Sequence, residues 1–293
     1  MSRLPVVVNP AARGGRRRVP RERIERAAAA RRLAVEWWET AAPGHATELA
    51  ARAARDRVPI LAVWGGDGTY NEAARGLVGS ETALLALPGG TTSVLAYEFG
   101  IPRDPQRALE VQLDGARRAM AVARTDRGQV FLLMLSVGPD ATILANIPAP
   151  LKRRAGKLGI GVQACVEFLR GGFPRFSVAA NGAELQASWC IVGKSRSYAG
   201  PYAATPAADP FALDFDVVTL TRHGRASLLP FFFAIPSGRH LHMRGVERAS
   251  AREVRLEGEG VPYQLDGDAA GELPVTARSS GDRLWVMVPA AAR

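Results

Sequence analysis

An aspartate among three glycines is the feature of this sequence that most directly indicates chemistry. The motif GGDGT, residues 65–69, follows an apolar run and precedes a stretch typical of a helix. Glycines allow positive φ angles and let a ligand lie against the main chain. Amide groups exposed in this way, beside a helix that we expect to begin at about Asn71, suit phosphate groups. The motif therefore predicts a phosphate site, although a tight turn is the simpler structural interpretation of GDG.

A second glycine loop of the same design supports the phosphate interpretation. The stretch LPGGTTSVLA, residues 87–96, also follows an apolar run and leads into a helical pattern. Two such loops at the ends of neighbouring strands would face one ligand. Neither the P-loop pattern GxxxxGK[ST] nor the dinucleotide fingerprint GxGxxG occurs in the sequence. The phosphate site is therefore of a different kind from these two.

Apolar runs and helical patterns alternate over about the first 115 residues. Short apolar strands separated by helices predict a parallel sheet that is covered on both faces. Ligands bind such sheets beyond the carboxyl ends of the strands, which is where both glycine loops fall. We expect strands at 5–8, 34–40, 59–64 and 83–88, and helices at 21–33, 44–56 and 104–114.

After about residue 118 one strand-like run follows another, with turn residues between them. This order predicts an antiparallel β-sandwich, so the expected fold class is α/β plus all-β. We place an α/β nucleotide-binding domain at residues 1–120 and a β-sandwich domain at 121–293, with the last few residues able to return to the first domain. Helices are expected only at about 151–170 and 225–235. The expected strands are 119–125, 129–138, 176–180, 185–193, 215–221, 252–257, 263–266, 273–278 and 283–288.

The charge balance indicates an anionic partner but does not identify it. The net charge of +10 and the pI near 10.5 suit a nucleotide, a nucleic acid or an acidic lipid surface. Only Lys152, Lys157 and Lys194 are lysines, so the basicity is nearly all arginine, which codon bias would equally produce. No basic helix with interleaved aromatic residues is visible, and we expect no nucleic-acid partner.

Cysteine usage and hydropathy predict a cytoplasmic protein. Cys165 and Cys190 are far apart and in no CxxC spacing, which argues against a disulfide scaffold or a zinc site. The apolar run at the N-terminus is too short for a signal peptide. The most apolar later segment, residues 228–236, is far shorter than the roughly 20 residues that span a bilayer. We therefore expect at most a peripheral contact with the inner face of a membrane.

Seven segments in the same order resemble the diacylglycerol kinase catalytic-domain family, which includes bacterial lipid kinases and, more distantly, sphingosine kinases and NAD kinases. The resemblance implies an ATP-dependent lipid kinase with its nucleotide between an α/β domain and a β-sandwich. The segments are NPAARGG (9–15), GGDGTYNEAARGL (65–77), LPGGTTSVLAYEFGIP (87–102), SVGPDA (136–141), KRRAGKLGI (152–160), IVGKSRSYAGPYAATP (191–206) and QLDGDAAGELP (264–274).

The resemblance also implies which residues bind the cofactors, ATP and Mg²⁺. Asp67 would orient Mg-ATP through water on the metal, because Mg²⁺ keeps several waters and takes other ligands from the nucleotide. The structural alternative for Asp67 is a helix or turn cap. The residues expected at the nucleotide are Asn9, Thr40, Gly65, Gly66, Asp67, Gly68, Thr69, Asn71, Gly90 and Thr91.

The catalytic base would come from the second domain. By resemblance, Asp268 takes the place of a family glutamate and Asp140 matches an aspartate that partners it. A carboxylate can take the proton of a lipid hydroxyl as the new P–O bond forms. Two nearby carboxylates also raise one another's proton affinity. Without the resemblance, LDGD would be interpreted as a hairpin turn; Glu272 is the alternative base.

The sequence departs from the family pattern at three places. Ser93 and Val94 stand where many relatives have Asn-Asp, although serine can still cap the helix. Asp268 is one methylene shorter than glutamate. The family's structural Mg²⁺ site uses an Asp-Gly pair where this chain has alanine and leucine. Asp209 and Asp214 flank that position, so either they supply the metal ligands or the site is absent.

Two questions of surface and partner stay open in the sequence. Lys157, Arg153 and Arg154 precede a helix whose apolar face contains Val162 and Leu169. This would suit an anionic lipid surface, but the sequence favours a helix that covers the sandwich. The expected substrate is a lipid at a membrane surface, and a homodimer is plausible. An NAD kinase-like enzyme and a catalytically silent nucleotide- or lipid-binding regulator are the alternatives.

Overall fold

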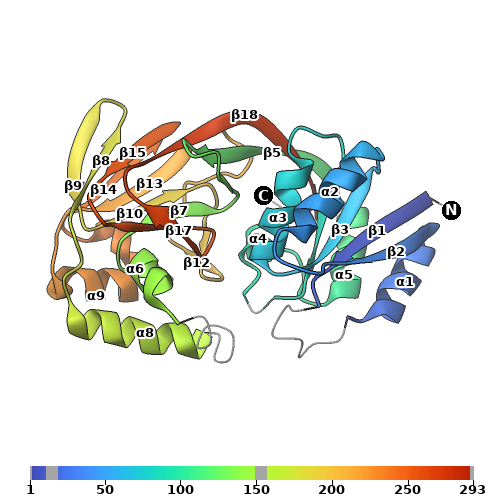
Figure 1. Cartoon of the computed structure of the whole chain (residues 1–293), viewed down its shortest axis with the longest axis horizontal. Helices are drawn as coiled ribbons and strands as arrows, with labels where there is room; N and C mark the ends of the chain where they lie inside the picture. Colours follow the sequence, from blue (N-terminus) through green and yellow to red (C-terminus); the bar gives the residue numbers. More distant parts are fainter. Residues whose placement is uncertain (1, 11–18, 91, 149–156, 291–293) are drawn as a thin grey trace. The chain divides into compact units, whose positions relative to one another are not determined.

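The computed structural model describes residues 2–10, 19–90, 92–148 and 157–290 (Figure 1). The chain forms two compact units. The first comprises Met1–Val122 together with Gly281–Arg293, and the second comprises Ala123–Ser280. The sequence-based boundary near residue 120 falls within strand β5 (Ala116–Thr125), which leads from the first unit into the second.

A parallel sheet forms the centre of the first unit. Its strands lie in the order β2-β1-β3-β4, and the end of β18 pairs with β4 through Val286 and Leu84. The inner strands β3 and β4 are continuous apolar runs, as expected where helices cover both faces of a parallel sheet. From β1 the chain continues to β2 on one side of β1 and then crosses to β3 on the other side. The carboxyl ends of β1 and β3 therefore form a topological switch point. The strands are β1 (Ser2–Val8), β2 (Leu33–Glu39), β3 (Ile60–Gly65) and β4 (Ala83–Pro88).

Small residues let two helices of this unit approach closely. Helix α2 buries Ala46, Ala50 and Ala53, and helix α3 packs against it. A Cβ added at Gly76 of α3 would lie 2.3 Å from the carbonyl oxygen of Thr47. Glycine is therefore required there by helix packing. The helices are α1 (Arg21–Ala29), α2 (His45–Arg55), α3 (Asp67–Leu77), α4 (Val94–Glu98) and α5 (Pro105–Leu113).

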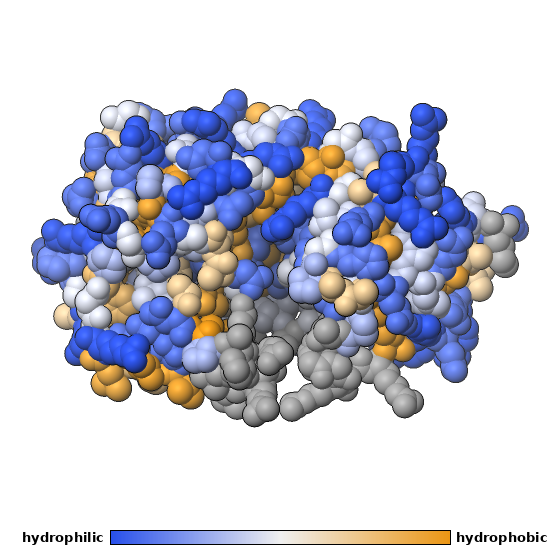
Figure 2. All heavy atoms as spheres, in the orientation of Figure 1, coloured by the Kyte–Doolittle hydropathy of each residue, from blue (hydrophilic) through white to orange (hydrophobic). Residues whose placement is uncertain are grey.

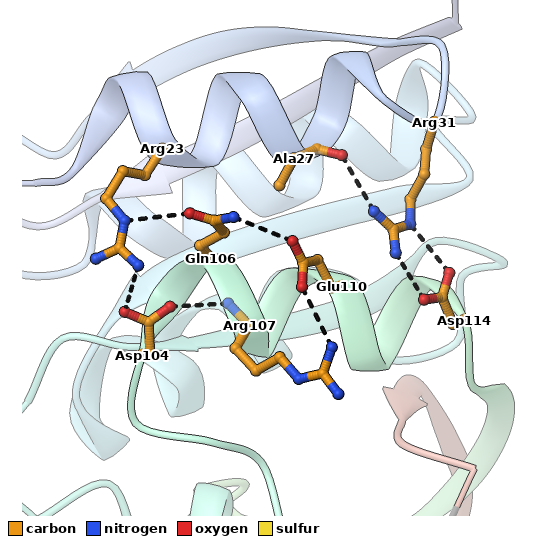
Figure 3. Close-up of polar contacts among 8 residues, drawn as sticks. All are labelled: Arg23, Ala27, Arg31, Asp104, Gln106, Arg107, Glu110 and Asp114. Atoms are coloured by element: carbon orange, nitrogen blue, oxygen red, sulfur yellow. Dashed lines mark hydrogen bonds and ion pairs between the residues drawn. The ribbon is translucent and has the colours of Figure 1, made fainter.

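Ionic contacts join α1 to α5 at both ends (Figure 3). Arg31 donates two hydrogen bonds to the carboxylate of Asp114, at 3.0 and 2.6 Å. At the other end Arg23 contacts Asp104, whose carboxylate also caps α5 by accepting from the Arg107 amide at 3.0 Å. The hydrogen bonds from Arg31 lower the pKa of Asp114, and the same contact raises the pKa of Arg31.

The second unit is a β-sandwich. One layer is a six-stranded antiparallel sheet in the order β14-β13-β10-β7-β16-β17. The other contains β18-β15-β8-β9, with β5 and β6 beside β18. Side chains from both layers form one core, which includes Phe131, Val137, Phe176 and Tyr263. The strands are β6 (Val130–Phe131), β7 (Met134–Val137), β8 (Phe176–Ala180), β9 (Ala183–Ala187), β10 (Trp189–Gly193), β13 (Phe215–Leu220), β14 (Val246–Ala251), β15 (Glu253–Glu257), β16 (Pro262–Leu265), β17 (Asp268–Glu272) and β18 (Val275–Val288).

Short helices and one small hairpin complete the second unit. Strands β11 (Ser197–Tyr198) and β12 (Tyr202–Ala203) form the hairpin. The helices are α6 (Pro139–Asn146), α8 (Lys157–Arg170), α9 (Arg225–Ala234) and the 3₁₀ turns η2 (Ile235–Ser237) and η3 (Arg239–His242). Within the described part of the chain, none of the helices has the length and apolar character needed to cross a bilayer.

Several expectations about the elements are wrong. The single strand expected at 185–193 is two strands in different sheets, β9 and β10, and strands β14 and β17 were not expected. Helix α3 begins at Asp67 and not near Asn71. Helix α6 was not expected, although Gly138 with a φ of +142° and Pro139 in the first turn are a helix-start signal. The two strands expected at 273–278 and 283–288 are one strand, β18, because its polar middle residues continue the extended chain from one unit to the other.

Replacing Asp114 tests the ionic contact between α1 and α5. Because the folded protein lowers the pKa of Asp114, the contact stabilises the fold above about pH 4 and is lost as the pH falls through the lowered pKa. We expect Asp114→Asn to lower the melting temperature slightly at neutral pH and to have no effect in strong acid. Glu48→Gln, on α2, removes the same charge elsewhere and serves as the control. A deficit in Asp114→Asn that does not change with pH would contradict this account.

Candidate active site

The ends of four adjacent parallel strands bring the expected nucleotide residues to one edge of the sheet. Strand β2 ends just before Thr40, and β1 ends just before Asn9. Strand β3 ends at Gly65, and β4 leads directly into the second glycine loop. The Thr40 amide donates to the carbonyl of Val8 at 2.9 Å, which holds the first two ends together. Thr91 and residues 11–15 of the NPAARGG segment lie outside the described residues.

The two glycine loops contact one another through their main chains. The carbonyl of Gly65 accepts hydrogen bonds from the amides of Gly89 and Gly90, both at 2.8 Å. A Cβ added at Gly90 would lie 2.7 Å from the Cα of Gly66. Gly66 has a φ of −107°, so the expectation that these glycines provide positive φ angles is wrong for it. Close approach of the two loops is the reason that glycine is required at position 90.

Asp67 joins the two loops through its side chain. It begins helix α3, and its carboxylate accepts hydrogen bonds from the amides of Val94 at 2.8 Å and Leu95 at 3.1 Å. These amides form the first turn of α4. Ser93 precedes them with a φ of +50° and makes no capping hydrogen bond, so the expectation that serine caps this helix is wrong. The capping interpretation of Asp67 is thus correct, and the helix that it caps belongs to the other loop.

Two polar side chains of α3, those of Thr69 and Asn71, are buried rather than exposed. Asn9 Nδ2 donates to Thr69 Oγ1 at 3.2 Å, which connects the end of β1 to the first turn of α3. A Cβ at Gly65 would lie 2.7 Å from that of Thr69. The path of the GGDGT loop is therefore fixed by the contacts of Thr69 with Asn9 and Gly65.

Asp140 is a buried acid in the first turn of α6. Tyr198 Oη donates to its carboxylate at 3.0 Å, and Gln264 Nε2 donates at 3.4 Å. Burial raises the pKa of Asp140, and hydrogen bonds from Ser136, Tyr198 and Gln264 oppose that rise. The sequence-based expectation was that a second carboxylate would raise the proton affinity. Desolvation is instead the dominant cause.

Asp268 follows a two-residue hairpin turn between β16 and β17. Leu265 pairs with Asp268, and the two residues between them, Asp266 and Gly267, have φ angles of +52° and +93°. Positive φ at both positions is characteristic of the type I′ turn that Asp-Gly favours. LDGD is thus a hairpin turn, as its residue types indicate. Asp268 is exposed at the start of β17, and Glu272 is exposed at the end of the same strand.

Gln264 connects the buried acid to this turn. Its Oε1 accepts from the Gly267 amide at 2.7 Å, while its Nε2 contacts Asp140. The turn also carries Asp266, whose carboxylate accepts from the amides of Leu132, Leu133 and Met134 at 2.8–3.0 Å. Sequence reasoning missed Asp266. The Asp-Gly pair signals the turn, but no pattern signals that its aspartate binds a segment more than a hundred residues away.

Asp209 and Asp214, the candidate metal ligands, belong to the loop whose main chain binds the buried ammonium of Lys194. Lys194 Nζ donates to the main-chain carbonyls of Asp209, at 3.3 Å, and of Ala212. Burial lowers the pKa of Lys194 to about 8, and the charges of Asp209 and Asp214 oppose that change. Asp214 also pairs with Arg252 at 3.0 Å. Among the described residues, no group of three or more His, Cys, Asp or Glu side chains is arranged to hold a metal ion.

Comparisons with known proteins identify the family. Residues 3–125 match the family model of the diacylglycerol kinase catalytic domain. Residues 134–288 match that of the YegS C-terminal NAD kinase beta sandwich-like domain. The chain therefore belongs to the diacylglycerol kinase catalytic-domain family, and it is a phosphotransferase of the lipid kinase class. This confirms both the family resemblance and the fold class expected from the sequence.

Individual relatives agree with this assignment. A diacylglycerol kinase of Mycobacterium tuberculosis is 28% identical over 253 residues, which cover 83% of this chain and 81% of the relative. A probable YegS-like lipid kinase of Chromohalobacter salexigens is 38% identical over 117 residues, 39% of this chain and 37% of the relative. The crystal structure of a putative diacylglycerol kinase from Bacillus anthracis shares the fold, with a TM-score of 0.80 at 20% identity over 100% of this chain and 97% of that one.

Alanine at Gly90 and at Gly66 provides a matched test of the loop contact. At Gly90 the added methyl group would overlap the Gly66 main chain, so we expect a loss of roughly 1–3 kcal/mol in the free energy of unfolding. At Gly66 the methyl would lie 3.5 Å from the nearest atom, Gly90 Cα, which is an ordinary contact, and we expect stability close to that of the wild type. Urea unfolding measures both. Equal losses in the two variants would contradict the packing described here.

Proposed function

We propose that this protein transfers the γ-phosphate of ATP, in the presence of Mg²⁺, to a hydroxyl group of a lipid such as diacylglycerol or a long-chain base. The observation that carries the proposal is the pair of glycine loops joined by the carboxylate of Asp67 at the carboxyl edge of a parallel sheet. The names of two relatives, diacylglycerol kinase and YegS-like lipid kinase, support the lipid acceptor.

In this proposal main-chain amides bind the phosphates. The first amides of a helix have no acceptor within the helix, and the helix dipole favours an anion beside them. The first turn of α3 holds Asp67, Gly68 and Thr69, and the main chains of Gly66 and Gly90 lie beside it without side chains. Asn9 and Thr40 complete the edge at the ends of β1 and β2. The buried side chains of Thr69 and Asn71 hold the loop in shape.

Mg²⁺ fits this site as an ion that arrives with the nucleotide. Asp67 is the acidic residue between the loops, and a carboxylate that accepts amide hydrogen bonds still has lone pairs that can accept from metal-bound water. The ion would neutralise charge on the phosphates as the bond to the leaving group breaks. Asp67 therefore has two roles in the proposal: it fixes the second loop and it orients Mg-ATP.

Asp268 is the proposed general base. It is exposed directly after the two-residue turn, so its carboxylate is accessible to a substrate hydroxyl. As the hydroxyl oxygen attacks the γ-phosphorus, its proton passes to Asp268, and the bond between the γ-phosphorus and the bridging oxygen breaks to release ADP. Asp140 is a positioning residue, because it acts on the turn through Gln264 and the Gly267 amide.

Replacing Asp268 and Glu272 separately tests the base. Asp268→Asn keeps the shape of the turn and removes the proton acceptor, so we expect kcat to fall by roughly 10²- to 10⁴-fold with Mg-ATP affinity unchanged. Glu272→Gln is the matched control on the same strand and should retain nearly full activity. The assay follows transfer of labelled phosphate to a panel of lipids and to NAD, with products identified by mass spectrometry. Mg-ATP binding without transfer to any acceptor would instead favour a regulator.

A membrane surface is the proposed location of the substrate, and helix α8 supplies the supporting observation. Its polar residues Gln163 and Glu167 are buried and joined by a 2.7 Å hydrogen bond, while Val162, Cys165 and Leu169 are exposed. The interpretation that the sequence favoured, a helix whose apolar face covers the sandwich, is therefore wrong for these three residues. Figure 2 shows apolar residues along the lower edge of the molecule, over α8.

Helix α9, which contacts the end of α8, also has an exposed apolar side chain. Its first residue, Arg225, donates to the main-chain carbonyl of Leu169 at the end of α8. Leu169 is 77% exposed and Phe233 of α9 is 72% exposed. The exposed side chains of Arg170 and Arg225 add positive charge. Apolar side chains flanked by arginine suit the boundary of a bilayer that contains anionic lipid.

Serine at Leu169 and Phe233 tests the membrane contact. Inserting a large apolar side chain into a bilayer is worth up to about 2 kcal/mol, so we expect the double variant to bind phosphatidylglycerol vesicles roughly 10- to 100-fold more weakly. Leu185→Ser, which changes a partly exposed leucine on β9, is the control. Activity on a short-chain, water-soluble lipid should be unchanged in both. Wild-type vesicle binding by the double variant would contradict the proposal.

A further inference from the structure

Lys194 is a buried cation that the proposed phosphoryl transfer does not use. It follows strand β10, and no part of its side chain reaches solvent. The amides of Lys194 and Ser195 both donate to the carbonyl of Leu133, at 2.8 and 2.9 Å, which fixes the main chain at this point. A charged side chain is seldom fully buried unless it is paired, so the groups around its ammonium define its role.

Oxygen atoms of the loop before β13 surround this ammonium. Its Nζ donates to the carbonyls of Asp209 and Ala212. Burial lowers the pKa of Lys194 to about 8, and the negative charges of Asp209 and Asp214 oppose that change. Main-chain carbonyls from a single loop, with carboxylates in the same loop, are oxygen ligands of the kind that a hard cation takes. In this chain the cation is a side chain of the protein.

The residues present do not fit a divalent ion at the same place. Mg²⁺ and Ca²⁺ require six or more oxygen ligands, and the ammonium already takes the two carbonyls. The Asp209 carboxylate accepts from the Phe211 amide at 2.9 Å, and that of Asp214 binds Arg252. A divalent ion beside the ammonium would also be repelled by it. Asp209 and Asp214 were the candidate ligands of the family's structural Mg²⁺ site. In this chain the ammonium of Lys194 binds the loop that contains them.

We propose that the ammonium of Lys194 is a built-in cation that replaces a structural divalent metal in folding the loop of residues 209–214. The loop leads directly into β13, which pairs with β10, the strand that Lys194 follows. Lys194 therefore holds the loop against the sheet that also contains β7 and β16. Under this proposal the second unit folds without metal, and the protein needs Mg²⁺ only with its nucleotide. The inference does not depend on which acceptor is phosphorylated.

Thermal unfolding of the nucleotide-free protein tests the proposal. We expect the melting temperature of the wild type to be the same in EDTA and in excess Mg²⁺. Lys194→Met keeps the apolar stem but leaves buried carbonyls without a donor, so it should lower the melting temperature by roughly 10 °C in either buffer. Arg252→Met is the control, since it removes an exposed partner of Asp214 and should cost no more than about 3 °C. Stabilisation of the wild type by Mg²⁺, or a Lys194→Met variant as stable as Arg252→Met, would overturn the proposal.

A smaller side chain tests the replacement more directly. Lys194→Ser opens the space of the ammonium and retains the surrounding oxygens, so Mg²⁺ or Ca²⁺ should raise its melting temperature while leaving the wild type unchanged. Equal responses of the two proteins, including no response in either, would overturn the proposal.

A measurement that leaves Lys194 unchanged guards against variants that do not fold. The sequence has only three lysines, so protein labelled with ¹⁵N-lysine gives at most three ammonium signals. We expect one of them to be visible through slow proton exchange and to remain when Lys152 and Lys157 are both replaced by arginine. Absence of such a signal, or its loss in the double arginine variant, would overturn the proposal.

Discussion

The contact between two glycine loops is the constraint on which the rest of the first unit depends. Gly90 can approach Gly66 only because it carries no Cβ, and the amides of Gly89 and Gly90 both donate to the carbonyl of Gly65. The carboxylate of Asp67 then fixes the second loop by binding the first two amides of α4. Hydrogen bonds to a charged group each contribute about 1.5–3 kcal/mol. The carboxylate of Asp67 and the glycines of the two loops therefore determine how the main chain is arranged where four strands end.

The two candidate catalytic acids of the second unit, Asp140 and Asp268, lie in different environments. Asp140 is buried, and desolvation raises its pKa, whereas Asp268 is exposed on a hairpin turn. Gln264 bonds to both Asp140 and the turn, so the buried acid influences the exposed one through position rather than through charge. Environment also separates the two faces of α8. Its buried Glu167 accepts hydrogen bonds from Gln163 and Asn146, while Val162 and Leu169 are exposed.

Sequence reasoning worked where a residue's role is local. Apolar runs located the four parallel strands, and strand order then explains why Asn9, Thr40 and the GGDGT loop share an edge. It failed where a role depends on a distant partner. The start of α3 at Asp67 accompanies a bond from that aspartate to the other loop, and Asp266 binds amides more than a hundred residues earlier. The outward apolar face of α8 was missed because periodicity identifies a face without saying what lies against it.

Mg-ATP binding by an Asp67→Asn variant tests the central claim most directly, with Glu72→Gln on the same helix as the control for lost charge. An asparagine oxygen can replace only one of the two amide contacts, so we expect at least about a tenfold loss of affinity by calorimetry. The amides of Val94 and Leu95 should lose protection from hydrogen exchange in the same variant. Wild-type affinity in Asp67→Asn, with those amides unprotected, would show that the joined loops are not where the nucleotide binds.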